Sequence, residues 1–153
     1  MNKFRVSKYN PKYRENGIYT KDEWTDYSDV GQVFENGILS LEEYLKTEEQ
    51  YILCIISVLK KDGIIFLSIE DFEQYGYTEW KDKTTVTIDE LSSLIRDCLR
   101  NKCWCKLRNN ETYLHFGYDY YVYISSGMSS KNMCTICRSY NLFCEELSSP
   151  YDS

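Results

Sequence analysis

The sequence predicts an α+β fold: a single domain over residues 1–153, with about three main helices packed against a largely antiparallel sheet. Apolar residues recur every three or four positions in three segments, as in amphipathic helices. Residues 103–124 instead alternate with a period of two between Asn-Asn and Gly-Tyr-Asp turns, which is typical of an antiparallel meander. A length of 153 residues suits one domain with a substantial core.

The first 36 residues predict a strand followed by a long loop. Residues 3–9 alternate in polarity, and Asn10-Pro11 should end the strand. Residues 12–36 show no sustained period and are rich in Gly and Asp, as loops are. Their five aromatic residues predict that this loop is ordered, because disordered segments lack such burial capacity.

The longest predicted helix covers residues 40–63. The Ser40 hydroxyl can accept from the Glu43 amide, and the Glu43 carboxylate can accept from the Ser40 amide, which makes a capping box. Glutamates in the first turn and lysines in the last match the helix dipole, and Gly63 ends the helix. The apolar stripe expected to face the core consists of Leu41, Tyr44, Leu45, Tyr51, Ile52, Ile55, Ile56 and Leu59.

The elements predicted after residue 63 are shorter. Ser68 is expected to cap a short helix that runs to Tyr75, after an apolar run at 64–67. Thr87 and Glu90 repeat the capping box before a helix that should stop at Asn101. The remaining expected elements are a loop at 77–85, strands at 104–107, 112–116, 120–124 and 142–147, a helix at 129–140 and a tail at 148–153.

Composition excludes several classes of protein. The chain is 42% apolar and 27% charged, as soluble globular proteins are, and it has neither an 18-residue apolar run nor an apolar N-terminal signal region. We therefore expect a cytoplasmic protein without a membrane partner. Seven cysteines without an export signal predict reduced thiols rather than a disulfide framework.

Charge is unevenly distributed along the chain. Residues 1–14 carry five basic residues and no acidic one, whereas residues 15–50 carry ten acidic and two basic residues, a net charge of −8 within an overall −6. Phosphate binding requires a basic surface, so the acidic section argues against direct binding of nucleic acid. It favours a basic protein partner.

One histidine and two cysteine pairs raise the question of catalysis or metal binding. His115 lies opposite in phase to Leu114 and Phe116 in a predicted strand, so it should face solvent or a groove. Nucleophilic catalysis with a histidine base also needs a nucleophile and an orienting group, and neither can be located from the sequence, so we expect no enzyme. A small enzyme using His115 and a thiol such as Cys103 or Cys105 is the alternative.

The four thiols of Cys103, Cys105, Cys134 and Cys137 could in principle surround zinc. The first pair shares a strand face and the second a helix face, whereas zinc ribbons use two CxxC-like knuckles on tight turns. We expect buried free thiols with no metal or other cofactor. A thiol-dependent or zinc-dependent regulator is a third reading.

Carboxylates interleave with aromatic residues in the long loop, and helix capping does not explain them. Aromatic residues can anchor an interface while carboxylates steer a basic partner, although the loop could also simply fold over its own aromatics. The residues expected to bind a partner are Asp22, Glu23, Trp24, Asp26, Tyr27 and Asp29, together with Tyr118 and Asp119.

Several short sequence segments, spread over most of the chain, form a recognisable pattern. They are YNPKYR at 9–14, GIY at 17–19, DEWT at 22–25, SDVG at 28–31, EEYL within 41–51, HFGYDYY at 115–121, LF at 142–143 and SPY at 149–151. Together they resemble a family of small bacterial immunity proteins encoded beside polymorphic toxins.

The resemblance implies a cytoplasmic antitoxin of the contact-dependent growth inhibition type. Such a protein binds the C-terminal domain of its cognate toxin and blocks the active site or substrate groove. The toxin would be expected to be a basic nuclease, such as an RNase, whose groove an acidic, aromatic surface could occupy. The resemblance supplies no toxin-contacting residues, so the eight residues above come from composition alone.

Overall fold

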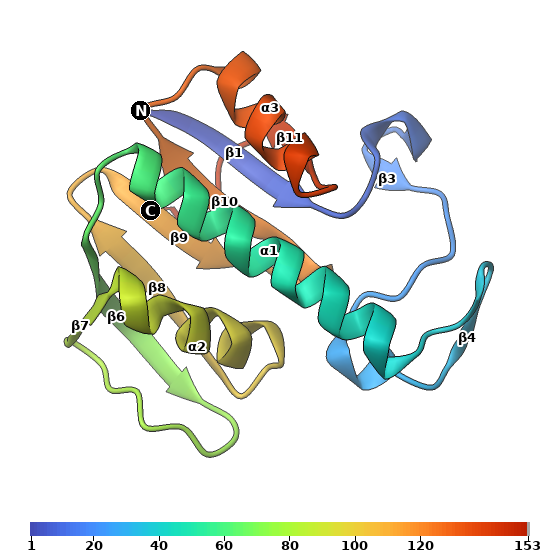
Figure 1. Cartoon of the computed structure of the whole chain (residues 1–153), viewed down its shortest axis with the longest axis horizontal. Coiled ribbons are helices and arrows are strands. Elements are labelled where there is room, and N and C mark those ends of the chain that lie inside the picture. Colours follow the sequence, from blue (N-terminus) through green and yellow to red (C-terminus); the bar gives the residue numbers. More distant parts are fainter. Residues whose placement is uncertain (153) are drawn as a thin grey trace.

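The computed structural model describes residues 1–152 and confirms an α+β domain, with three helices and a seven-stranded antiparallel sheet over that range. Helices α1 (Leu41–Lys61), α2 (Ile88–Leu99) and α3 (Ser130–Ser139) lie on the same side of the sheet (Figure 1). The strand order is β11-β1-β10-β9-β8-β6-β7. The strands are β1 (Asn2–Ser7), β6 (Phe66–Gln74), β7 (Thr85–Thr87), β8 (Cys103–Asn109), β9 (Thr112–Phe116), β10 (Val122–Ser126) and β11 (Phe143–Glu146).

The core lies between the sheet and the helices. Alternate strand residues such as Phe4, Leu107 and Leu114 are fully buried against the helices. The predicted stripe of α1 is mostly confirmed, but Leu41 and Leu45 are 50% and 42% exposed. Figure 1 explains this exception, because the first turns of α1 extend beyond the strands.

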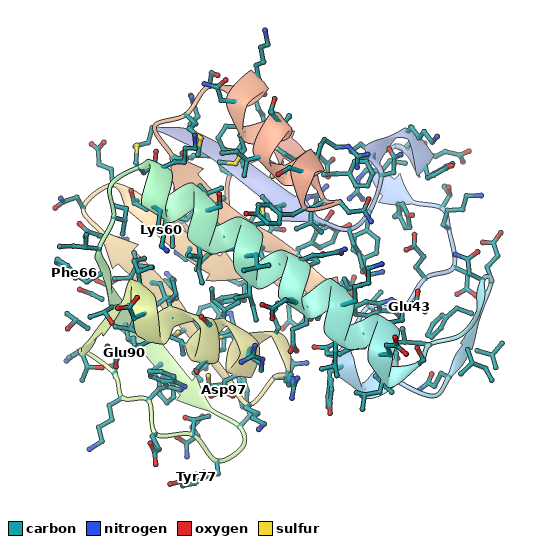
Figure 2. All side chains as sticks on the ribbon, viewed as in Figure 1. Glu43, Lys60, Phe66, Tyr77, Glu90 and Asp97 are labelled. Atoms are coloured by element: carbon teal, nitrogen blue, oxygen red, sulfur yellow. The ribbon has the colours of Figure 1, made fainter. Side chains whose placement is uncertain are left out.

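The helix ends follow the local signals. The Ser40 hydroxyl accepts from the Glu43 amide at 3.1 Å, which is one half of the expected capping box. Thr87 and Glu90 form the complete box at the start of α2. Asn101 adopts a left-handed conformation (φ 59°) just after α2, as expected. Figure 2 labels Glu43 and Lys60 at the two ends of α1 and Glu90 and Asp97 on α2.

The predicted short helix at 68–75 is wrong, because this segment belongs to β6. Its backbone pairs with β7 on one side and β8 on the other, and Ile69 is buried between the half-buried polar residues Ser68 and Glu70. A bulge between Glu70 and Glu73 interrupts the alternation, which hides the strand period in the sequence. Strand pairing on both edges outweighs the weak cap signal of Ser68.

Residues 10–39 form the ordered loop that the sequence predicts. Trp24 and Leu39 are buried, at 7% and 2% exposure, and tie the loop to the core. Figure 1 shows the loop at the end of the sheet where α1 begins. It contains the 3-10 turns η1 (Pro11–Tyr13) and η2 (Tyr27–Asp29), and the hairpins β2 (Arg14–Glu15) with β3 (Ile18–Tyr19) and β4 (Val33–Phe34) with β5 (Gly37–Ile38).

The tail predicted at 148–153 covers the other face of the sheet; Ser153 lies outside the described residues. Ser149 Oγ lies 2.7 Å from His115 Nδ1, and Asp152 forms a 2.7 Å ion pair with Lys3 on β1. His115 does point away from the helices, but it is only 1% exposed. The expectation that it faces solvent or a groove is therefore wrong, because the tail lies over it.

Candidate functional site

A pocket of about 430 Å³ opens at the end of the sheet where β8 begins and β9 ends. This volume lies in the range of small-molecule and side-chain binding sites. Seven of the side chains around it are aromatic and three are carboxylates, and within residues 1–152 none of the lining residues is Lys or Arg. The pocket is therefore both aromatic and acidic.

The turn between β9 and β10 forms one wall of this pocket. A 3-10 turn, η3 (Tyr118–Tyr120), delays β10 to Val122, two residues later than expected. Asp119 and Tyr120 both adopt left-handed conformations (φ 58° and 66°), which cost on the order of 1–3 kcal/mol each for such residues. Tyr118 is turned outward as a result, at 85% exposure.

Packing of Tyr120 and a backbone bond hold this strained turn. The Tyr120 ring, only 5% exposed, lies 5.0 Å from Trp24 and 4.8 Å from Tyr51, measured between ring centres. The Tyr9 hydroxyl donates to the Asp119 carbonyl at 2.7 Å. The core thus fixes the turn, while the Tyr118 and Asp119 side chains face outward.

The acidic loop also contributes to the lining, through Thr25 and Asp26. The Asp26 carboxylate accepts from the Ser28 amide at 3.0 Å and from the Asn101 side-chain amide at the end of α2. Asp29 accepts from the amides of Thr25 and Asp26, at 2.9 and 3.2 Å. These two carboxylates fold the loop, and Asp26 also lines the pocket.

Three other expected residues of the loop, Glu23, Trp24 and Tyr27, pack inward. Glu23 forms a 3.3 Å ion pair with Lys8, whose ammonium lies 4.3 Å from the Trp24 ring centre. Burial lowers the pKa of Lys8 to about 8, although Glu23 opposes that shift. Trp24 is 7% exposed, and Tyr27 packs edge-on against Tyr44 at 4.9 Å.

The structure therefore brings together three of the eight expected residues, Asp26, Tyr118 and Asp119, around one pocket. Asp22 is exposed but lies outside it. Sequence reasoning missed Glu73, Tyr75, Trp104 and Tyr151 in the lining. Glu73 and Tyr75 did carry the acid-beside-aromatic signal, within the segment mistaken for a helix.

His115 offers a substrate no access. Its Nδ1 contacts Ser149 Oγ, and over residues 1–152 its buried Nε2 has no hydrogen-bond partner. Burial, with a smaller contribution from Lys106, lowers the pKa of His115 to about 4, so the ring is neutral at pH 7. This geometry lends no support to the alternative of a small enzyme that uses His115.

All seven cysteines are free thiols; five are buried, whereas Cys134 and Cys144 are half-buried. Cys98 Sγ lies 3.7 Å from Cys103 and 4.0 Å from Cys105, whereas Cys137 contacts Cys54 at 3.9 Å. Hydrogen bonding to the neighbouring thiols and burial raise the pKa of Cys98, which disfavours the reactive thiolate. In the described part of the chain, no three His, Cys, Asp or Glu side chains are arranged to hold a metal ion.

Comparison with protein-family models gave no match to this chain, and searches of curated proteins and of solved structures gave none either. Among the described helices, none is long and apolar enough to cross a membrane.

Proposed function

We propose that this chain is an immunity protein, a non-enzymatic inhibitor that binds the C-terminal domain of a cognate contact-dependent growth inhibition toxin in the cytoplasm. We expect that domain to be a basic nuclease, such as an RNase, whose active site or substrate groove is blocked by the complex. The observation that supports this proposal best is the meeting of Asp26 with Tyr118 and Asp119 at one pocket. Composition had singled out both segments as partner-binding.

Surface charge supports the same partner. Within the acidic section, Glu23 is paired with Lys8, and the buried Glu48 with Arg96 and Arg100. The carboxylates of this section on exposed residues are Glu15, Asp22, Glu35, Glu42, Glu43 and Glu49, of which Glu49 also pairs with Arg96 at 3.5 Å. Together with the acidic pocket they would attract a basic groove and repel nucleic acid itself.

Calorimetric titration with the C-terminal domain of the toxin encoded beside this chain tests the proposal. We expect a one-to-one complex and rescue of growth when both are expressed together. Failure of the two purified proteins to bind would overturn the proposal.

Charge reversal can locate the contact surface. Reversing Asp26 or Asp29 would also break the bonds that fold the loop, so Asp22→Lys is the cleaner variant. It should slow association with the toxin domain, most strongly at low salt. Glu111→Lys is the matched control, because Glu111 is exposed and lies just before β9, at the end of that strand away from the pocket. Equal association rates for the two variants would remove Asp22 from the contact surface.

A further inference from the structure

This fold repeatedly places its own cations over aromatic rings. The Lys8 ammonium lies 4.3 Å from the ring centre of Tyr9, the Arg5 guanidinium 4.4 Å from that of Tyr121, and Arg100 4.9 Å from Tyr27. Four rings that line the pocket differ: across residues 1–152, no cation of the chain lies over Tyr75, Trp104, Tyr118 or Tyr151.

The carboxylates of the pocket also lack a Lys or Arg partner. Among the described residues, four of the eight buried or half-buried acids form ion pairs, such as Glu48 with Arg100 at 2.8 Å and Glu145 with Arg5 at 3.2 Å. The half-buried Asp26 and the exposed Glu73 and Asp119 have no Lys or Arg nitrogen within 4.0 Å among the described residues. Three carboxylates and four aromatic rings without a cation over them thus line one pocket whose lining contains no Lys or Arg, although a fifth lining ring, Tyr121, is covered by Arg5.

We propose that this pocket receives an arginine side chain of the protein partner. The guanidinium group is planar, stacks on aromatic rings and donates two parallel hydrogen bonds to a carboxylate, so it uses both features of the pocket. Trp104 and Tyr151, with ring centres 5.2 Å apart, provide one aromatic surface, and the exposed ring of Tyr118 provides another. Identification of the partner as a toxin domain rests on the proposed function; the chemistry of the pocket does not.

Other occupants fit less well. A nucleotide could stack its base on the same rings, but its phosphates would come close to three carboxylates. A lysine ammonium would satisfy the charge, but it is compact and strongly hydrated and cannot stack as a flat group. The pocket should therefore prefer arginine to lysine.

A peptide titration of the isolated protein tests this preference without any toxin. The probes are three capped tripeptides, Gly-Arg-Gly, Gly-Lys-Gly and Gly-Gln-Gly, and the readout is the NMR shift of the Gly117 and Asp119 amides. We expect saturable binding of the arginine peptide, weaker binding of the lysine peptide and none of the glutamine peptide. Equal behaviour of the arginine and glutamine peptides, or no shift with either, would overturn the inference.

Matched variants show whether the pocket is the binding site. Tyr118→Ala and Asp119→Asn should each weaken arginine-peptide binding about 2- to 30-fold, the range expected for one cation–π or charged contact. Tyr77→Ala and Glu111→Gln remove a similarly exposed tyrosine and an exposed carboxylate outside the pocket, and should change nothing. Figure 2 shows Tyr77 on the loop after β6. Equal loss in pocket and control variants would overturn the inference.

Binding to the toxin domain is the second test of the arginine contact. Tyr118→Ala should raise the Kd of that complex at least about 10-fold, as expected for a buried aromatic hot spot, and Tyr77→Ala should not. A toxin complex that tolerates Tyr118→Ala would refute the arginine contact and leave the proposed function standing. Specific arginine-peptide binding without any toxin complex would support the pocket chemistry and refute the proposed function.

Discussion

The stability of this protein should depend on the protonation of His115 in the mildly acidic range. Burial beneath the tail lowers the pKa of this histidine to about 4, from an ordinary value of 6.5 in the unfolded chain. The unfolded state therefore binds a proton at a higher pH than the folded state does. The resulting stability is fully present above about pH 6.5 and is lost as the pH falls towards about 4.

The two pKa values set the size of the effect. Between about pH 7 and about pH 5, linkage predicts a loss of about 2 kcal/mol in the free energy of unfolding. The contacts explain why the folded protein resists protonation. Nδ1 is already engaged by Ser149, and a proton on Nε2 would lie buried without an acceptor among the described residues.

Urea unfolding at the two pH values measures this loss. His115 is the only histidine of the chain, so His115→Asn removes the one side chain that ordinarily titrates in this interval. The variant is expected to be less stable at both pH values but to lose about 2 kcal/mol less than the wild type between them. Identical pH dependence in the two proteins would refute the buried, neutral histidine and the covering tail.

Two further substitutions test the packing that supports the pocket. Glu48→Gln should destabilise the fold by about 2–3 kcal/mol in urea unfolding, somewhat less than for a fully buried pair because its arginine partners remain 20–36% exposed. Glu49→Gln, at a 53% exposed carboxylate, should cost less than about 0.5 kcal/mol, and equal losses would contradict the buried network. Gly117→Ala should cost about 1–3 kcal/mol in thermal unfolding, because its Cβ would lie 2.8 Å from a ring carbon of Tyr123. Gly127→Ala is the control, because its Cβ would have no neighbour closer than 3.8 Å. If Gly117→Ala proved as stable as the control, the turn must be able to move away from the added methyl group.

Local signals predicted most of the fold. Capping residues located α1 and α2, and the period of two located β8 and β9, because both signals depend on neighbours in the sequence. The 68–75 segment failed for the opposite reason. Its strand conformation depends on β7 and β8, which lie far along the chain, and a bulge hides its alternation.

The sequence predicted which kinds of residue form the site, but it could not predict which of them meet in the folded protein. Acid beside aromatic marked Asp26, Tyr118 and Asp119, which do meet at the pocket. The sequence could not show that Glu23 and Trp24 lie outside the pocket. Glu23 pairs with Lys8, 15 residues away along the chain, and Trp24 is buried in the core. The covering of His115 likewise depends on the last residues of the chain folding back across the sheet.

Stoichiometric inhibition is the most direct test of the immunity function. The activity of the cognate toxin domain, assayed on its nucleic acid substrate, should fall in proportion to added protein and vanish at about one equivalent, as for tight one-to-one binding. Full toxin activity in the presence of a molar excess of this protein would contradict the proposal.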